Sequence, residues 1–487
     1  MNEYNLIVIT SSTKAYKQGF YCIISVINHF KQEPKMIAEQ LINILNDKLK
    51  NPIYKTIQLI NIKDILNKSN FTKKEGVAVH LVVLHFVYML VMNKKITTFM
   101  KQSDNSFKKD VYYRLLKNQT YNWRKLLSLS SIKLISFLQK LQNSKSVKVF
   151  IIDDTVEDKT GKKIEGSRDK LYSNKEKRFI RGINVISLNY SDGLSNFMLD
   201  FAMNMGKYAR VTIDEMLGEL DHRTIAYKRR AEIMKGKHQL AIDMIKRAVK
   251  SGVYADYLLV DSWYSKPIFL KEMNKLGVRV ISRMANNKSI WNFKDKANTL
   301  DAIYEKFKHL RKAKSGLYGK IKFTYFSVLM EHKKAGKIRI VFIKTSNKLI
   351  PIVSTDIEIS DSEIIEIYKR RWDIEQGYKE LRQHFGFGEE ENRIYEALIA
   401  RITLSFFTYN IVSYINRISN EPQTIGGLFT DLECELSTLA IAMKTFIAIL
   451  EEVAKIDDIV NRNEDLTSII SVLQDVTQKM LGFRCES

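Results

Sequence analysis

DSEIIEIYKRRWDIEQGYKELRQ, residues 361–383, is the stretch that decides the fold. It contains no Pro and begins with Asp361, which can cap a helix, so it predicts one long helix. At about 100° per residue, its apolar side chains form one stripe that should face a core. This stripe comprises Ile367, Ile374, Tyr378 and Leu381.

A second set of side chains on this helix lies beside the apolar stripe. Tyr368, Arg371, Glu375 and Arg382 fall within about 60° of one another. A carboxylate flanked by guanidinium groups at the border of a buried face costs free energy, so a functional use of these groups is expected. The alternative is a ladder of ion pairs, four residues apart, on a solvated face.

The spacing of these four residues resembles the Tyr-Arg-Glu-Lys signature of a large group of bacterial insertion-sequence DDE transposases. The neighbouring RWDIE letters and the Tyr-Lys-Glu-Leu segment are similar to that family too. One position differs, because the family has Lys where this chain has Arg382. Charge is kept, but Arg presents a planar fork and Lys a compact ammonium. The resemblance implies that Tyr368, Arg371 and Arg382 contact phosphates near a cleaved DNA end.

The charge of the whole chain favours a polyanionic partner. Its 487 residues include 78 Lys and Arg against 54 Asp and Glu, which gives a formal net charge of +24. Nucleic acid is the commonest partner of such a protein, although ribosomal and membrane-surface proteins are basic as well. The length allows two or three domains with cores of their own.

Cysteine usage and the apolar segments indicate a protein of a reducing compartment without a membrane partner. Cys22, Cys434 and Cys485 are far apart and predict neither a zinc site nor a disulfide framework. The N-terminus has an early acidic residue and too short an apolar run for a signal peptide. Residues 77–92 and 397–415 are apolar but contain His or Arg, so they predict buried helices.

Residues 1–140 are Lys-rich and mostly helical in pattern, and they resemble the DNA-binding region that precedes the catalytic core in related transposases. Within residues 106–129, basic side chains alternate with aromatic ones, which suits phosphates and sugar edges. The candidate DNA contacts there are Lys109, Arg114 and Arg124. The alternative is an ordinary pair of amphipathic helices whose aromatic residues belong to the core.

Two short apolar runs end in acidic residues. SVKVFIIDDT predicts a buried strand with Asp153 and Asp154 at its tip, and YADYLLVDSWY predicts a second one that ends at Asp261. Acidic groups at the carboxyl ends of strands are how open α/β sheets build sites. Between these runs, a strongly basic loop is followed by two strands around residues 191–193, whose Ser-Asp-Gly letters predict a hairpin.

The order of elements is similar to that of DDE transposases, in which three strands, a helix, a strand and a helix carry Asp, Asp and Glu. The expected fold is α/β, with a ribonuclease H-like mixed sheet and a β-rich insertion, flanked by helical N-terminal and C-terminal regions. The expected divisions are a DNA-binding region at 1–140, core segments at 141–277 and 358–410, the β-rich insertion at 278–357, and a helical C-terminal region at 411–487.

The resemblance implies that Asp154, Asp261 and Glu375 are catalytic residues and metal ligands. Carboxylate oxygens are the ligands that Mg²⁺ prefers, and Mn²⁺ is expected to substitute for it. Two such ions can stabilise both the attacking and the leaving oxygen of a phosphodiester. The strand pattern does not decide between Asp153 and Asp154, because residues on both faces are apolar. The Asp-Thr pair typical of the family favours Asp154, which leaves Asp153 beside the metals or in solvent.

The expected function is that of a transposase that binds double-stranded DNA at the ends of its mobile element, nicks it and joins the 3′ ends to target DNA. The resemblance implies a hairpin intermediate, a homodimer on paired ends, and a bacterial cytoplasmic, nucleoid-associated location. The alternatives are a catalytically inactive DNA-binding derivative and another ribonuclease H-like nuclease. Trp263 and Trp372 could stack on an extruded base, but buried tryptophan is commoner, so both are expected in the core.

Overall fold

The computed structural model describes residues 51–438, apart from residue 74 and the segments 103–107, 142–145, 174–175, 207–208, 286–290, 294–295, 319–320 and 390–391. Its contacts divide the chain into two compact units. The first comprises residues 1–54, 97–107 and 434–487, and the second comprises residues 55–96 and 108–433. Of the first unit, the description covers the beginning of α3 (Pro52–Leu59), most of α6 (Ile96–Gln102) and residues 434–438.

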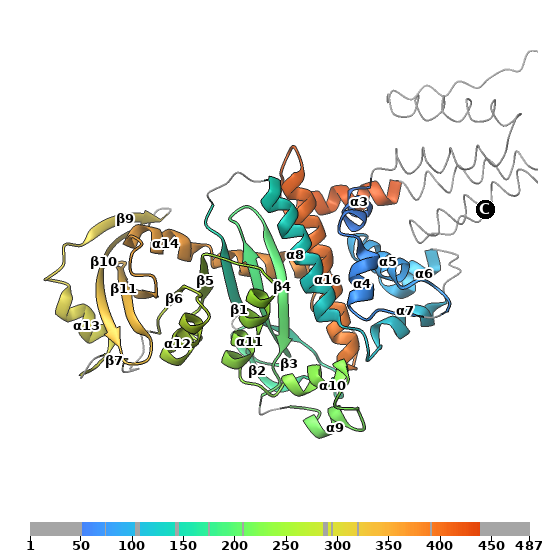
Figure 1. Ribbon diagram of the computed structural model, residues 1–487, viewed down its shortest axis with the longest axis horizontal. Coiled ribbons are helices and arrows are strands. Elements are labelled where there is room, and N and C mark those ends of the chain that lie inside the picture. Colours follow the sequence, from blue (N-terminus) through green and yellow to red (C-terminus); the bar gives the residue numbers. More distant parts are fainter. Residues whose placement is uncertain are drawn as a thin grey trace, which may run out of the picture. The chain divides into compact units, whose positions relative to one another are not determined.

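The predicted elements before residue 51 and after residue 438, together with Cys22 and Cys485, lie outside the described residues. Four helices begin the second unit, and a mixed sheet and further helices follow (Figure 1). The four helices are α4 (Ile62–Lys68), α5 (Val79–Val91), α7 (Lys109–Leu116) and α8 (Trp123–Leu141).

Among the described residues, twelve strands form one mixed sheet in the order β2-β3-β1-β5-β6-β12-β11-β10-β7-β8, with β4 on β3 and β9 on β10. The first six strands are β1 (Val149–Asp158), β2 (Arg168–Ser173), β3 (Arg178–Ser191), β4 (Asn196–Met203), β5 (Tyr257–Val260) and β6 (Val280–Arg283). The last six are β7 (Trp291–Phe293), β8 (Lys296–Asn298), β9 (Lys314–Tyr318), β10 (Ile321–His332), β11 (Gly336–Lys344) and β12 (Leu349–Ser354). The predicted α/β class with a mixed sheet is confirmed.

The pairing of the strands explains how the acidic tips come together. β1 is antiparallel to β3 and parallel to β5, and β5 is parallel to β6. The predicted hairpin around residues 191–193 is present between β3 and β4. β6 also pairs antiparallel with β12, so the strands after residue 290 continue the same sheet. Whether they form a separate subdomain stays a prediction.

Helices follow the strands along the rest of the chain. Five of them are α9 (Ile213–Leu217), α10 (Ile225–Glu232), α11 (Lys237–Lys250), α12 (Pro267–Lys275) and α13 (Leu300–Phe307). The next three are α14 (Asp361–Lys369), α15 (Trp372–His384) and α16 (Tyr395–Ile418), and residues 425–438 are helical as well. α8 and α16 run side by side and contact β4 (Figure 1).

The long helix expected at residues 361–383 is present as two helices. Arg371 and Asp373 donate backbone hydrogen bonds to the carbonyls three residues earlier, so the chain tightens between α14 and α15. The Arg370 guanidinium is held at this turn, where it donates to the carbonyls of Val147 and Ser191. The prediction of a single continuous helix is therefore wrong.

The capping residue of α14 also differs from the expectation. Ser360, rather than Asp361, occupies the N-cap, and its hydroxyl accepts from the backbone N–H of Glu363. The Glu363 carboxylate in turn accepts from the Ser360 backbone N–H, which completes a capping box. Asp361 lies in the first turn and pairs with Arg339 at 3.0 Å.

Both apolar stretches form buried helices, as predicted. In α5, eleven of thirteen residues are buried. Among the described residues, α16 is the one helix long and apolar enough to cross a membrane, and 94% of its apolar window is buried within the protein. Its buried Asn410 is bonded to the edge of β4, where it accepts from the Met198 N–H and donates to the Met198 carbonyl. This contact covers the free edge of the sheet.

Candidate active site

The second half of β1 distributes its side chains alternately between two faces. Asp153, Thr155 and Glu157 face α15, because Arg371 donates to Asp153 at 3.0 Å and Arg382 donates to Thr155 and Glu157. Successive side chains of a strand point to opposite faces. Asp154 accordingly lies on the other face.

The partners of Asp154 come from the face away from α15. Its carboxylate accepts from the Lys237 ammonium, at the beginning of α11, and from the Asn184 side-chain amide, each at 2.7 Å. Nothing in the sequence pattern of α11 marked Lys237 as a neighbour of the acidic tip. The structure therefore surrounds Asp154 with a lysine and an amide, and it surrounds Asp153 with groups of the signature helix.

Asp261 lies beside the tip of β1. β5 is parallel to β1 with Val260 opposite Ile152, so the next residue of each chain, Asp261 and Asp153, continues the same register. Neighbouring strands are about 4.8 Å apart, and residues opposite one another in a sheet share a face. The Asp261 carboxylate accepts from the backbone N–H of Trp263 at 2.9 Å, which fixes the turn after β5.

Glu375 joins the same cluster through an arginine. The Arg371 guanidinium donates to Glu375 with one nitrogen and to Asp153 with another, so one cation bridges the two carboxylates. The ion pair between Arg371 and Glu375, four residues apart, is the one expected if the helix only carried a ladder of ion pairs. The same guanidinium also contacts Asp153 on β1. Tyr368 completes the group, because its hydroxyl donates to the Val260 carbonyl at 3.4 Å, next to Asp261.

Burial shapes the acidity of these groups. The pKa of Asp153 is raised to about 7, chiefly because the carboxyl is buried; Arg371 opposes this shift, and Asp154 and Asp261 add to it. Burial also raises the pKa of Asp261. The pKa of Tyr368 is raised to about 12, again mainly by burial. Two buried carboxyls with raised pKa values are short of positive charge, in spite of Arg371.

The raised pKa of Asp153 gives the first testable prediction. Below about pH 4 the carboxyl is protonated in both the folded and the unfolded chain. As pH rises from about 4 to 7, the unfolded chain ionises first, so the folded state loses stability, and above about pH 7 the loss is complete. We expect Asp153→Asn to remove this slope, a differential on the order of a few kcal/mol in the free energy of unfolding.

The measurement is thermal unfolding of wild type and Asp153→Asn in chelator at pH 5, 6, 7 and 8. The difference between the two melting temperatures should shift in favour of the variant as pH rises from 5 to 7 and should then level off. Lys237 and Asn184 hold Asp154 on the other face, so Asp154→Asn serves as the matched control. A difference that stays constant from pH 5 to pH 8 would contradict the raised pKa.

The two tryptophans near the acidic cluster are not core residues, contrary to the expectation. Trp263 is 44% exposed and Trp372 is 62% exposed. The Trp263 ring stacks on His238, with ring centres 4.3 Å apart, and Lys237 and Lys266 lie over it. Both tryptophans are therefore accessible beside Asp261 and Arg371, their neighbours in the chain.

The predicted DNA contacts in the N-terminal region have different surroundings. Arg124 is nearly buried and pairs with Asp200 and Glu232 at 2.8 Å each, which favours a structural role for this guanidinium. Lys109 and Arg114 are exposed on α7, and Arg114 pairs with Asp110. The aromatic residues follow the alternative interpretation, since Tyr112, Tyr121 and Trp123 are buried, although Tyr113 is partly exposed.

Sequence reasoning missed the groups that hold the last signature residue. Arg382 donates to Glu157 at 2.6 Å and also to Thr155, and it lies over the rings of Tyr378 and Phe387. The signal was present in the alternation of Asp153, Thr155 and Glu157 along one face of a strand. Within the described part of the chain, no group of three or more His, Cys, Asp or Glu side chains is arranged to hold a metal ion.

Comparison with protein families bears on this arrangement. Residues 95–301 match the family of DDE superfamily endonucleases, and residues 234–411 match the transposase DDE domain. The two matches together span residues 95–411 and support a DDE transposase. The first match includes Asp153, Asp154 and Asp261, and the second includes Asp261 and Glu375. No curated protein matches the sequence.

Transposase families act on DNA, and these matches indicate that the chain is an enzyme, a nuclease or transposase. Its mixed sheet with helices at both ends is consistent with the ribonuclease H-like fold expected for such a domain. Enzymes of this superfamily generally use divalent metal ions. Asp153, Asp261 and Glu375 supply the hard carboxylate oxygens that such ions prefer, although the described residues do not hold them in a ready-made metal site.

Proposed function

We propose that this DDE enzyme is a transposase that binds the ends of its mobile element, nicks them and joins the 3′ ends to target DNA. The observation that carries the proposal is the bridge made by Arg371, whose guanidinium holds Asp153 and Glu375 together beside the strand end that bears Asp261. The Arg371 guanidinium occupies a position between two carboxylates that metal ions could also fill. If Arg371 turned to a DNA phosphate, metal ions could take its place beside Asp153 and Glu375.

The ligands that we propose for Mg²⁺, or for Mn²⁺ in its place, are Asp153, Asp261 and Glu375. Asp153 replaces Asp154 in this proposal because Asp153 shares its face with Arg371 and its register with Asp261. Two bound ions would stabilise charge on the attacking and leaving oxygens of an in-line phosphoryl transfer. Lys237 and Asn184 would hold the Asp154 carboxylate on the face of β1 away from α15. From there Asp154 would help to position Asp153, its neighbour in the chain.

Arg371 is proposed to change partners when DNA binds. Its planar fork suits a phosphate as well as a carboxylate, so a phosphate at the cut site can take the guanidinium and release Asp153 and Glu375 for the metal. Tyr368 and Arg382 flank it on the same two helices and would contact neighbouring phosphates. Arg382 departs from the Lys of the family signature, and its fork already serves both Thr155 and Glu157.

Other parts of the proposal rest on the family rather than on contacts within this chain. We propose a hairpin intermediate at the element end, with exposed Trp263 and Trp372 available to an extruded base. Lys109 and Arg114 remain the proposed contacts of the N-terminal DNA-binding region. The assembly on paired ends is proposed to be a homodimer, and the location is proposed to be the bacterial cytoplasm, on the nucleoid.

The experiment that tests the function is cleavage of a labelled duplex that carries the inverted repeats flanking the coding sequence. We expect cleavage with Mg²⁺ or Mn²⁺ and binding alone with Ca²⁺, with a hairpin product that resists separation on a denaturing gel. Binding without cleavage in every metal would favour the inactive DNA-binding derivative. Cleavage of branched DNA with no preference for the repeats would instead favour another ribonuclease H-like nuclease.

A second prediction concerns Arg371. We expect Arg371→Ala to slow end cleavage by about 100-fold, because the lost donor would act on charge at the phosphate, and to change DNA affinity less than threefold. Single-turnover cleavage rates and fluorescence anisotropy measure the two quantities separately. Arg371→Lys should recover only part of the rate, since an ammonium cannot bridge two oxygens in the same plane.

The matched control is Lys379→Ala, which removes one exposed positive charge from the same helix. We expect this variant to cleave at the wild-type rate. If Arg371→Ala lost binding and cleavage in the same proportion, Arg371 would be a general DNA contact and the role assigned to it would be incorrect.

A further inference from the structure

The basic loop after β1 forms a two-stranded hairpin at the edge of the sheet. We call the face of β2 and β3 that carries Lys170, Tyr172, Phe179 and Arg181 the hairpin face. Tyr172 and Phe179 are directly opposite in the register, 51% and 65% exposed, with ring centres 5.5 Å apart. The next pair, Leu171 and Ile180, is buried on the other side. Two large aromatic side chains are thus held in solvent by a well-defined strand pair.

Positive charge surrounds the two rings. Lys170 and Arg181 are exposed on the same face, one step nearer the body of the sheet, and Arg181 lies 3.8 Å from Asp169. Lys177 and Arg178 are exposed beyond Phe179, where Arg178 pairs with Glu176. Exposed aromatic rings with lysine and arginine on both sides suit nucleic acid, because the cations meet phosphates and the rings meet sugars and base edges.

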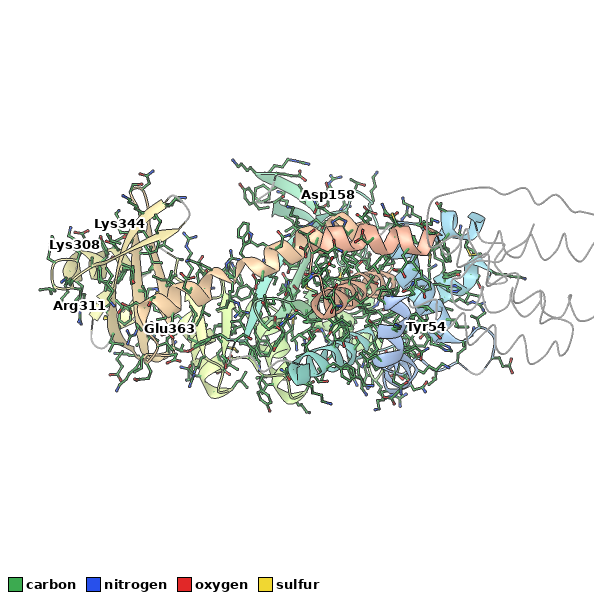
Figure 2. All side chains as sticks on the ribbon, turned by 90° about the horizontal axis from the view of Figure 1, so that it is seen from above. Tyr54, Asp158, Lys308, Arg311, Lys344 and Glu363 are labelled. Atoms are coloured by element: carbon green, nitrogen blue, oxygen red, sulfur yellow. The ribbon has the colours of Figure 1, made fainter. Side chains whose placement is uncertain are left out.

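The hairpin face belongs to the same side of the sheet as the candidate active site. Ser187 of β3 lies opposite Asp153 and contacts Tyr378 of α15, so it faces the catalytic side. Every second residue of β3 shares that face, which brings the series through 185 and 183 to Arg181 and Phe179. Figure 2 shows the strands beside Asp158 projecting from the body of the sheet, and Tyr172 and Phe179 are exposed there.

We propose that the hairpin face binds the duplex DNA that flanks the bond to be cut. Eight residues separate Ser187 from Phe179, and at about 3.3 Å each they span roughly 26 Å. One base pair of B-DNA rises about 3.4 Å, so the contact falls about eight base pairs from the reacting phosphate. A two-stranded β-ribbon fits the major groove, where Tyr172 and Phe179 would meet base edges and sugars while Lys170 and Arg181 meet phosphates.

This inference rests on the proposed function, because it takes the acidic cluster as the place where the phosphate reacts. Its test compares two duplexes, one extending twelve base pairs beyond the cut site on each side and one ending five base pairs from it. We expect wild type to bind the long duplex at least tenfold more tightly than the short one. For Tyr172→Ser/Phe179→Ser, and separately for Lys170→Ala/Arg181→Ala, the ratio should fall below threefold.

Three further readouts make the test decisive. Lys170→Ala/Arg181→Ala should reduce the slope of log affinity against log salt by about 2 on the long duplex and leave it unchanged on the short one. Cleavage of the short duplex should be unaffected by either double variant. Leu310→Ser/Leu329→Ser, which changes two side chains that are 71% and 59% exposed elsewhere, is the matched control and should keep the wild-type ratio.

The outcomes separate the hairpin from the proposed function. A ratio that stays at the wild-type value in both hairpin variants overturns the inference, and so does a wild type that binds the two duplexes equally. If the variants instead change the sedimentation of the free protein while the ratio is kept, the face binds a second copy of the chain. Wild-type protein that binds the long duplex through this face but cuts neither duplex contradicts the proposed function alone.

Discussion

Asp153→Asn is expected to abolish DNA cleavage, with a loss of roughly a thousandfold or more, while DNA affinity stays within threefold of wild type. The carboxylate shares the α15 face with Arg371 and Glu375 and continues the register that leads to Asp261. An amide keeps the size of the side chain but offers a divalent ion one weaker oxygen. Asp261→Asn should have the same effect, since both acids are assigned to the same ions.

Asp154→Asn is the variant to compare with Asp153→Asn, because the comparison tests which of the two acids is the metal ligand. Asp154 lies on the opposite face and is neutralised by Lys237, so we expect a loss of about 10-fold to 100-fold, as for a group that supports a ligand. The measurements are single-turnover cleavage with Mg²⁺ and anisotropy with Ca²⁺. If Asp154→Asn lost more activity than Asp153→Asn, the first ligand would be Asp154, as the Asp-Thr pair of the family signature indicated.

Arg230→Ala is expected to give the largest change in stability, about 3–5 kcal/mol in the free energy of unfolding. The side chains of Arg230 and Glu396 are 6% and 7% exposed, and two nitrogens of the guanidinium donate to the carboxylate at 2.7 Å and 2.6 Å. Glu165 lies 2.9 Å from the same guanidinium. Removing Arg230 leaves buried negative charge between α10 and α16 without a partner.

Two controls accompany this measurement, which uses the midpoint of urea unfolding. Arg230→Met/Glu396→Leu removes both charges and keeps the volume, so it should recover most of the lost stability. Arg223→Ala removes the exposed arginine that pairs with Asp221, and it should leave the midpoint close to that of wild type, because solvent screens an exposed ion pair. A loss equal to that of Arg223→Ala would mean that solvent reaches the Arg230 pair.

Much of the sheet could be predicted because each strand has a strong local signal. Apolar runs ending in acid gave β1 and β5, and Ser-Asp-Gly gave the turn between β3 and β4. The interruption between α14 and α15 had no such signal, because neither Gly nor Pro stands at residues 370–371. At this break, Arg370 donates to the carbonyls of Val147, which precedes β1, and of Ser191 in β3, and these distant residues come near it only in the folded chain.

The sequence predicts which residues belong to the candidate site. It does not predict how their side chains are arranged around β1. Ile151 and Ile152 are both fully buried, so apolar residues lie on both faces of β1 and the sequence pattern cannot say which face Asp153 takes. The face is evident only in the folded chain, where Arg371 of the signature helix donates to Asp153, and Lys237 and Asn184 donate to Asp154. Likewise, Trp263 resembles a core residue in sequence, yet it is exposed because the turn after Asp261 directs it to the surface.

The amide of Asn410 limits how copies of this protein can join. The Asn410 side chain accepts from the Met198 N–H and donates to the Met198 carbonyl on the outer side of β4. Its helix, α16, contacts the same strand. A second chain therefore cannot pair with the backbone of Met198 to extend the sheet from one copy into the next. The proposed homodimer would therefore not be built by adding a strand beside Met198 of β4.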